Sequence, residues 1–163
     1  MSRITDRVEV GVPVRTAYDQ WTQFESFPEF MEGIDRVVQL DDATLEWTAT
    51  IGGQRRSWRA KIVRQVPDRL IAWAATEGAR NDGVVTFEPL EPGRTSVTLE
   101  MDVEPDGPVE RAGDALGVVE HRVGEDLHRF KEFIEGRGVE TGAWRGTIAG
   151  GKVVDDDTAS RLS

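Results

Sequence analysis

The order of its periodic segments constrains this chain more than any other feature. Apolar residues alternate along a first stretch near the N-terminus and along six later stretches, with two short helical patterns between the first stretch and the second. A long amphipathic helix is predicted after them, from Pro108 to Gly136. A sheet with one apolar face must cover that face, and a helix with an apolar stripe is a suitable cover. The pattern predicts an α+β fold in which a curved antiparallel sheet and the long helix enclose a core or a cavity.

The N-terminal part predicts one strand and both short helices. Polar and apolar residues alternate over residues 4–10, which is typical of a strand with one buried face. Apolar residues at helical spacing follow Pro13 and end at Trp21. The segment from Phe24 to Met31 predicts a second short helix that Pro28 begins or bends. We expect this second helix to plug one end of the sheet.

Turn signals predict how the later strands pair. Gly52 and Gly53 favour a two-residue hairpin, because a type I′ turn needs positive φ at both positions. Further turns are predicted at residues 67–68 and 91–93, and the polar stretch 76–83 is predicted to be a loop. The residues expected to lie opposite each other are Trp47 and Trp58, Ala49 and Arg56, Ile62 and Trp73, Phe87 and Val97, and Val85 and Leu99.

Large apolar side chains on the inward face of this sheet are the candidate ligand-binding residues. Aromatic rings can wall a cavity for a flat or greasy molecule, and small alanines beside them leave room. A packed core is the alternative interpretation of the same residues. The candidates are Trp47, Trp58, Trp73, Phe87, Leu99 and Met101 of the strands, and Val119 and Val123 of the long helix.

Polar residues at inward positions are the candidates for chemistry. Arg56 is predicted next to Trp58, where its guanidinium could bind a carbonyl or enolate oxygen, although an Arg so close to a turn usually extends to the rim. Tyr18 is a second weak candidate. Periodicity also places three further charged residues inward, where mutual pairing is an alternative to catalysis: Asp6, Arg64 and Asp126.

Composition excludes several classes of function. The chain has 163 residues and no Cys, which excludes disulfides, thiolate catalysis and Cys-based zinc sites. A net charge of −10 disfavours nucleic acid as a partner. No stretch approaches the roughly 20 apolar residues that span a bilayer, so we expect a cytoplasmic protein without stable membrane insertion. His121 and His128 are predicted on the solvent side of the long helix, and we expect neither a metal nor a cofactor.

The sequence divides into a domain, residues 1–137, and a Gly-rich, acidic tail, residues 138–163, that we expect to be mobile. Within the tail, Trp144 and Ile148 are the residues suited to docking on the domain or on a partner. Three glycines interrupt the long helix and indicate a hinge, close packing on a neighbouring segment, or packing in a homodimer: Gly113, Gly117 and Gly124.

Several motifs together resemble a known superfamily. They are WTQFESFPEF (residues 21–30), TEGARNDGVVTFEPL (76–90), DALGVVEHRVGEDLHRFKEFIE (114–135) and ETGAWRG (140–146). In these motifs the chain resembles the bacterial polyketide cyclase/dehydrase-like and coenzyme Q-binding-like branch of the SRPBCC, or START-like, superfamily. The resemblance implies a helix-grip fold, in which a seven-stranded antiparallel sheet wraps around a long C-terminal helix, with two short helices after the first strand.

The residues and the resemblance together lead to three functional hypotheses. The first is a carrier or accessory protein that binds a small hydrophobic molecule, such as a quinone, a lipid or a polyketide, between the sheet and the helix. The second is a cofactor-independent polyketide aromatase/cyclase-dehydrase that promotes aldol closure with an Arg; Arg56 and Tyr18 are the residues here that could serve, and no His faces inward. The third is an interaction module that docks through Trp144. Whether the chain is an enzyme stays open on the sequence alone.

Overall fold

The structure is a computed structural model that describes residues 2–31, 34–51, 53–76, 81–103 and 112–155. The helices and strands follow in the order β1 (Ser2–Val10), α1 (Val14–Trp21), η1 (Phe24–Glu29), β2 (Ile34–Asp41), β3 (Thr44–Ile51), β4 (Gln54–Val66), β5 (Leu70–Ala75), β6 (Asn81–Glu91), β7 (Arg94–Val103), α2 (Ala112–Arg137), β8 (Thr147–Ala149) and β9 (Lys152–Asp155). Here η1 is a short 3-10 helix.

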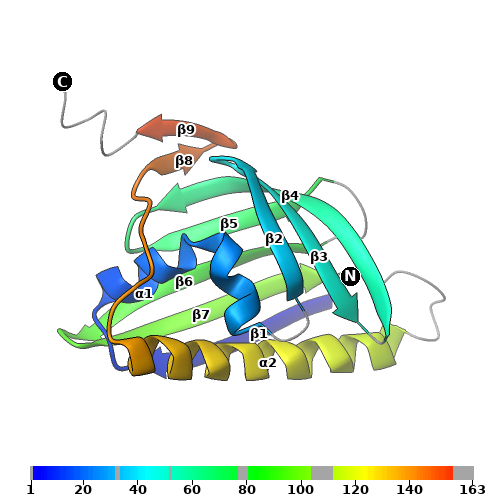
Figure 1. Ribbon diagram of the computed structural model, residues 1–163, viewed down its shortest axis with the longest axis horizontal. Coiled ribbons are helices and arrows are strands. Elements are labelled where there is room, and N and C mark those ends of the chain that lie inside the picture. The colour runs from blue at the N-terminus through cyan, green and yellow to red at the C-terminus, as the bar shows by residue number, and fades with distance from the viewer. Residues whose placement is uncertain (1, 32–33, 52, 77–80, 104–111, 156–163) are drawn as a thin grey trace.

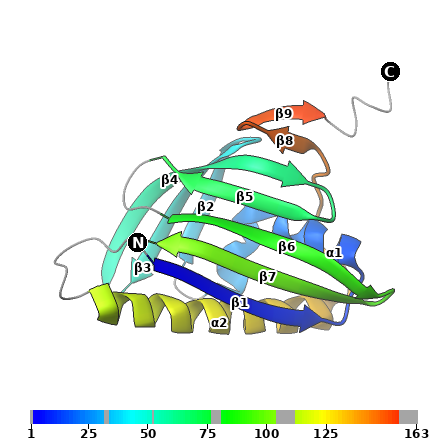
Figure 2. The same ribbon diagram turned by 180° about the vertical axis from the view of Figure 1, so that it is seen from behind.

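One strongly curved antiparallel sheet forms the body of the molecule. Its strands lie in the order β1-β7-β6-β5-β4-β3-β2, and β8 and β9 extend it from β4. The long helix α2 runs beneath the sheet, while α1 and η1 lie inside its curve (Figure 1). The view from behind shows the strands rising in order from β1, which lies beside α2, to β4 (Figure 2). The predicted α+β helix-grip arrangement is confirmed, with two short C-terminal strands in addition.

The predicted strand register is also confirmed. Trp47 lies opposite Trp58 and Ala49 opposite Arg56 in the β3–β4 pair. The remaining predicted pairs occur as well: Ile62 with Trp73, Phe87 with Val97, and Val85 with Leu99. The turn positions and the apolar alternation predict the same register. A slip by one residue would move every apolar side chain of a strand to the other face of the sheet, so the burial of one face fixes the register.

Residues 81–83 belong to β6, so the prediction of a loop over 76–83 is wrong for these three residues. Gly83 pairs with Trp73 across β5 and β6. A Cβ atom at Gly83 would lie 2.5 Å from the indole of Trp73 and 2.8 Å from the carbonyl oxygen of Glu100. Gly83 therefore occupies a strand position because the Trp73 ring covers it, and a glycine within a strand marks such close approaches.

The long helix begins at Ala112 in the described part of the chain, and the start predicted at Pro108 lies outside the described residues. Its inward residues are buried, in the order Val123, Leu127, Phe130 and Ile134. At Gly124 a Cβ atom would lie 2.9 Å from Oδ2 of Asp6 on β1, which favours close packing as the reason for this glycine. Gly113 and Gly117 lie outside the residues whose side-chain surroundings the structure describes.

The sequence predicts a mobile tail in the segment after α2. The structure shows two strands there, β8 and β9, while residues 156–163 lie outside the described part. Strand β8 pairs with β4, and Ile148 is completely buried. Trp144 packs against the core, and its backbone N–H donates to Oγ1 of Thr22 at 3.1 Å. The segment packs on the domain through these two apolar side chains, although its overall composition is Gly-rich and acidic.

Arg145 anchors the same segment through charge. Its guanidinium donates to Oδ1 of Asp19 at 2.5 Å and to Oδ2 of Asp68 at 2.8 Å, and it lies 5.5 Å from the centre of the Tyr18 ring. Two hydrogen bonds join Thr141 to Gln20 of α1: Nε2 of Gln20 donates to Oγ1 of Thr141, and the backbone N–H of Thr141 donates to Oε1 of Gln20. We call residues 138–149 the C-terminal strap, because they tie α1, the β4–β5 turn and β4 together.

Candidate ligand-binding cavity

An apolar cavity of about 150 Å³ lies between the inner face of the sheet and α2. Every strand from β2 to β7 contributes to its wall, as do α1, η1 and α2. The curvature of the sheet produces the cavity, because one straight helix cannot fill the whole concave face. An apolar cavity of this volume holds a molecule about the size of benzene, and drug-sized ligands occupy roughly 300–1,000 Å³.

Most of the predicted ligand-binding residues lie in this wall. They are Trp47, Trp58, Trp73, Leu99, Met101 and Val123. Phe87 is buried elsewhere, with its ring edge-on to Tyr18 at 5.4 Å between centroids. The side chain of Val119 lies outside the described part of the chain. The strand alternation thus located the wall, and a role in ligand binding stays a prediction for each of these residues.

Aromatic residues before β2 complete the wall, and the sequence reasoning missed them as lining residues. Trp21, Phe24 and Phe27 reach the cavity from α1 and η1. Trp21 and Phe27 pack edge to face at 5.2 Å, and Phe27 lies 5.7 Å from Trp47 on β3. The sequence feature that could have identified them is the dense spacing of aromatic residues in FESFPEF, from which we predicted a helix that plugs one end of the sheet and not a part of the cavity wall.

Trp47 and Trp58 line the cavity as a stacked pair. Their rings are almost parallel, with an angle of 4° between planes and 6.0 Å between centroids. This geometry follows directly from the β3–β4 register, which sets the two residues opposite each other.

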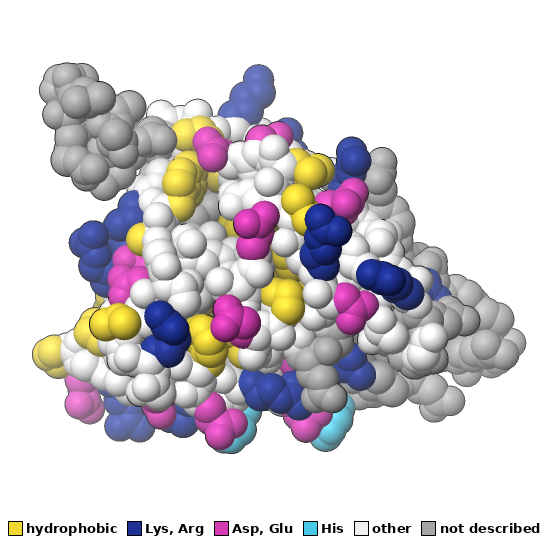
Figure 3. Space-filling view, viewed as in Figure 1, with side chains coloured by type: hydrophobic (Ala, Val, Ile, Leu, Met, Phe, Trp, Pro, Cys, Tyr) yellow, Lys and Arg dark blue, Asp and Glu magenta, His cyan; other side chains and the backbone are white. Residues whose placement is uncertain are grey.

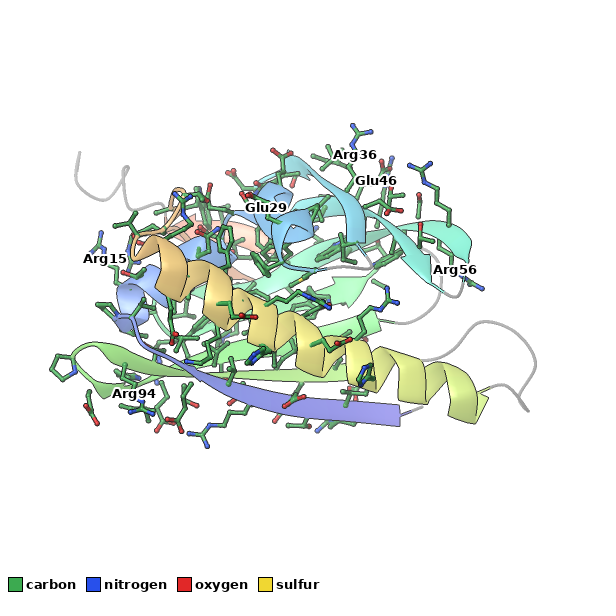
Figure 4. The ribbon with its side chains drawn as sticks, turned by 60° about the horizontal axis from the view of Figure 1, so that its bottom comes forward. Arg15, Glu29, Arg36, Glu46, Arg56 and Arg94 are labelled. Carbon is green, nitrogen blue, oxygen red and sulfur yellow. The ribbon has the colours of Figure 1, made fainter. Side chains whose placement is uncertain are left out.

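Neither predicted catalytic residue is among the residues that line the cavity. Arg56 is half-buried near the β3–β4 turn, and Figure 4 shows it at the outer rim of the sheet. Tyr18 is completely buried beneath the strap, where its hydroxyl accepts a hydrogen bond from Nε2 of Gln65 at 3.0 Å. Burial raises the pKa of Tyr18 to about 12, which keeps the phenol neutral. The surroundings of Tyr18 are those of a structural residue.

Two charged side chains do reach the cavity wall, and both come from α2. Arg122 and Asp126 are one helical turn apart and line the cavity together with Val123 and Leu127. Periodicity had placed Asp126 inward, whereas Arg122 was missed because it lies at the margin of the apolar stripe. Asp6, in contrast, lines a shallow surface groove beside β1, and Arg64 is exposed.

Both histidines face away from the cavity, as predicted. His121 lies 3.2 Å from Glu125 and His128 lies 3.8 Å from Glu132, and each His side chain is more than two-thirds exposed. Figure 3 shows them at the lower edge of the molecule, among charged side chains. The part of the chain that the structure describes contains no cluster of His, Asp and Glu suited to a metal ion. Among its helices, none is long and apolar enough to cross a bilayer.

The sheet wrapped on α2, with a cavity between them, defines a START-like helix-grip protein. Within that class, the chain belongs to the polyketide cyclase/dehydrase and lipid transport family, whose sequence model matches residues 10–132. The chain is 48% identical over 149 residues to an uncharacterised 17.2 kDa protein of Streptomyces lincolnensis, with 91% of this chain and 99% of that protein covered.

Solved structures share the fold. A protein of Deinococcus radiodurans is 26% identical with a TM-score of 0.66, over 83% of this chain and 99% of that one. The Zhui aromatase/cyclase of Streptomyces sp. R1128 is 18% identical with a TM-score of 0.75, over 87% and 98%. A START superfamily protein of Mycobacterium smegmatis is 18% identical with a TM-score of 0.64, over 83% and 95%. At such identities the likeness concerns architecture, and function must be argued from the cavity.

Proposed function

We propose that the protein binds a small hydrophobic molecule in the cavity between the sheet and α2, as a carrier or an accessory protein. The observation that supports this proposal is the apolar lining, part aromatic and part aliphatic, of a space of about 150 Å³ beside the hydrophobic core of the domain. Native interiors leave few voids larger than a water molecule, and an empty apolar cavity costs stability. A guest that fills it recovers contacts that the protein alone does not make.

The volume limits what enters. One aromatic or quinone ring, or a short stretch of alkyl chain, matches about 150 Å³, whereas a fused polycyclic molecule does not. A quinone, a lipid or a polyketide would therefore place one ring-sized part in the cavity, unless the walls separate. This makes the ring-sized part the feature that the protein recognises.

Native mass spectrometry of the protein purified from its own host, followed by organic extraction, tests the proposal. A matched pair of variants sharpens the test, because Met101 lines the cavity and its neighbour Glu100 alternates to the opposite face of β7. Met101→Trp should fill the cavity and abolish ligand capture, while Glu100→Trp should retain it. An empty wild-type protein that binds nothing from a panel of lipophilic compounds would refute the proposal.

A polyketide cyclase/dehydrase is the second candidate function. It is supported by the family match and by the presence of a cation and a carboxylate, Arg122 and Asp126, in an apolar cavity wall. Aldol closure requires a donor that stabilises an enolate oxygen and a group that accepts a proton. Under this hypothesis, turnover of a reactive polyketone should fall with Arg122→Met and remain with Arg56→Ala, because Arg56 does not line the cavity.

A further inference from the structure

The wall of the cavity carries two opposite charges one helical turn apart. Among the described lining residues, the charged ones are Arg122 and Asp126. They lie four residues apart on α2, so their side chains share one face of the helix. The rest of the described wall is aromatic and aliphatic, and its polar side-chain groups include the buried indole N–H groups of Trp21 and Trp47, which have no hydrogen-bond partner. The charged groups that a ligand meets come from α2.

Arg122 is positioned by the sheet. Its Nη1 donates to the carbonyl oxygen of Thr50 near the end of β3, at 3.4 Å. This contact ties the guanidinium to the end of β3, and Trp47 and Trp58 of the same β3–β4 hairpin also line the cavity. A guanidinium has five N–H donors in a planar fork, so it is able to serve a backbone carbonyl and a ligand oxygen at once.

Asp126 is held from the next turn of the same helix. Its Oδ1 accepts a hydrogen bond from Nη1 of Arg129 at 3.0 Å, and its side chain is only 15% exposed. A carboxylate this deep in an apolar wall is costly without a partner, and Arg129 offsets that cost. A carboxylate has about four acceptor positions, so it can accept hydrogen bonds from several donors at once.

We propose that Arg122 and Asp126 bind the hydroxyl group of a single-ring, neutral aromatic ligand. This inference rests on the proposed binding function and names the ligand class. A hydroxyl accepts from the guanidinium and donates to the carboxylate, so it uses both groups together. A carboxylate or an ammonium on the ligand would be attracted by one of the two groups and repelled by the other, and it would lose its hydration in an apolar cavity. A pure hydrocarbon would leave both charges without a gain. The cavity volume of about 150 Å³ admits one ring.

Isothermal titration with three isosteric probes tests the proposal: 4-methylphenol, p-xylene and 4-methylbenzoate. They share one ring and one methyl group and differ at the position that would face α2. The wild-type protein should bind 4-methylphenol about tenfold more tightly than p-xylene, since a hydrogen bond to a charged group has that order of effect. It should bind 4-methylbenzoate most weakly.

Variants assign the preference to the two residues. In the double variant Arg122→Met/Asp126→Leu, the two neutral probes should bind with the same affinity, with p-xylene bound at least as well as by the wild type. His128→Leu is the matched control, because His128 lies on the exposed side of the same helix. It should leave the tenfold preference intact.

The outcomes separate this proposal from the more general one. Equal binding of 4-methylphenol and p-xylene by the wild-type protein would overturn the assignment of a hydroxyl site and leave the binding function standing. A preference that survives in the double variant would overturn it too. Failure of the wild type to bind either neutral probe would overturn both the assignment and the binding function. The wild-type comparison decides the matter even if the double variant does not fold.

Discussion

Replacing Arg145 by methionine removes the cation that holds the C-terminal strap on α1. The guanidinium bonds Asp19 at 2.5 Å and Asp68 at 2.8 Å, and the side chain of Asp19 is 1% exposed. Arg15 remains near Asp19 at 3.7 Å, but its own side chain is 67% exposed and therefore screened by solvent. The variant keeps a similar aliphatic stem and leaves a buried carboxylate with a poor partner.

The expected loss follows from that burial. Removing one member of a buried ion pair costs about 3–5 kcal/mol, and the lost contact with the Tyr18 ring contributes within the same range. We expect Arg145→Met to lower the free energy of unfolding by about 3 kcal/mol at pH 8. For a domain of this size, that corresponds to a fall in melting temperature of roughly 6–12 °C.

The loss should depend on pH in a definite direction. Burial raises the pKa of Asp19 from its ordinary 3.8 to about 6, against the opposing effect of Arg145. A carboxyl group with a raised pKa binds its proton more tightly in the folded state. Its contribution to stability is therefore present below the unfolded pKa and is lost as the pH rises through the folded pKa. Without Arg145 the folded pKa rises further, so the variant should be closest to the wild type at pH 5 and furthest from it at pH 8.

Urea denaturation at pH 5 and pH 8, monitored by tryptophan fluorescence, measures the difference in the free energy of unfolding between the variant and the wild type. Arg15→Met serves as the control, because it removes an exposed cation from the same carboxylate and should cost less than about 1 kcal/mol. Asp19→Asn combined with Arg145→Met should restore part of the loss at pH 8. A loss below about 1 kcal/mol that is equal at both pH values would refute the reasoning about the buried pair.

Three further changes test separate parts of the structure by the same denaturation assay. Gly83→Val would place a Cβ atom 2.5 Å from the Trp73 ring and should cost about 1–3 kcal/mol, whereas a small effect would show that the ring moves freely. Tyr18→Phe removes the hydroxyl that Gln65 bonds, and it should cost about 1–3 kcal/mol because the Gln65 amide is completely buried; no loss would contradict that role. Glu135→Gln should lower the free energy of unfolding by less than about 1 kcal/mol, and only above pH 4.5. The reason is that the hydrogen bond from Lys131 lowers the pKa of Glu135, and stability from a lowered carboxyl pKa is lost as the pH falls. An equal effect of the substitution at pH 3 would contradict this reasoning.

The strand pairing could be predicted from the sequence because its causes are local. The period of two along each strand, together with the turn at Gly53, is enough to set Trp47 opposite Trp58. The stripe on α2 is local in the same sense, and it correctly placed both histidines in solvent. Asp126 was placed inward by that same periodicity.

The residues of the cavity wall were predicted less completely. Whether a side chain reaches the cavity depends on how elements that are far apart in the sequence pack together. Phe87 alternates inward as expected, yet α1 lies over its strand, so it packs on Tyr18 instead of lining the cavity. Arg56 is on the inward side of its strand but too near the turn to be covered by α2. Arg122 lies at the margin of the helix stripe, and only the position of the β3–β4 hairpin turns that margin into a wall.

By itself, the sequence determined the class of fold, the register of the sheet and the aromatic face of its inner side, since all three depend on residue spacing within one element or one hairpin. The tertiary structure alone decided that a void of about 150 Å³ remains between sheet and helix, that Arg122 joins Asp126 among the described residues of its wall, and that the strap docks through Arg145. Volume and burial depend on how separate elements pack, and no periodicity along a single chain encodes the distance between them.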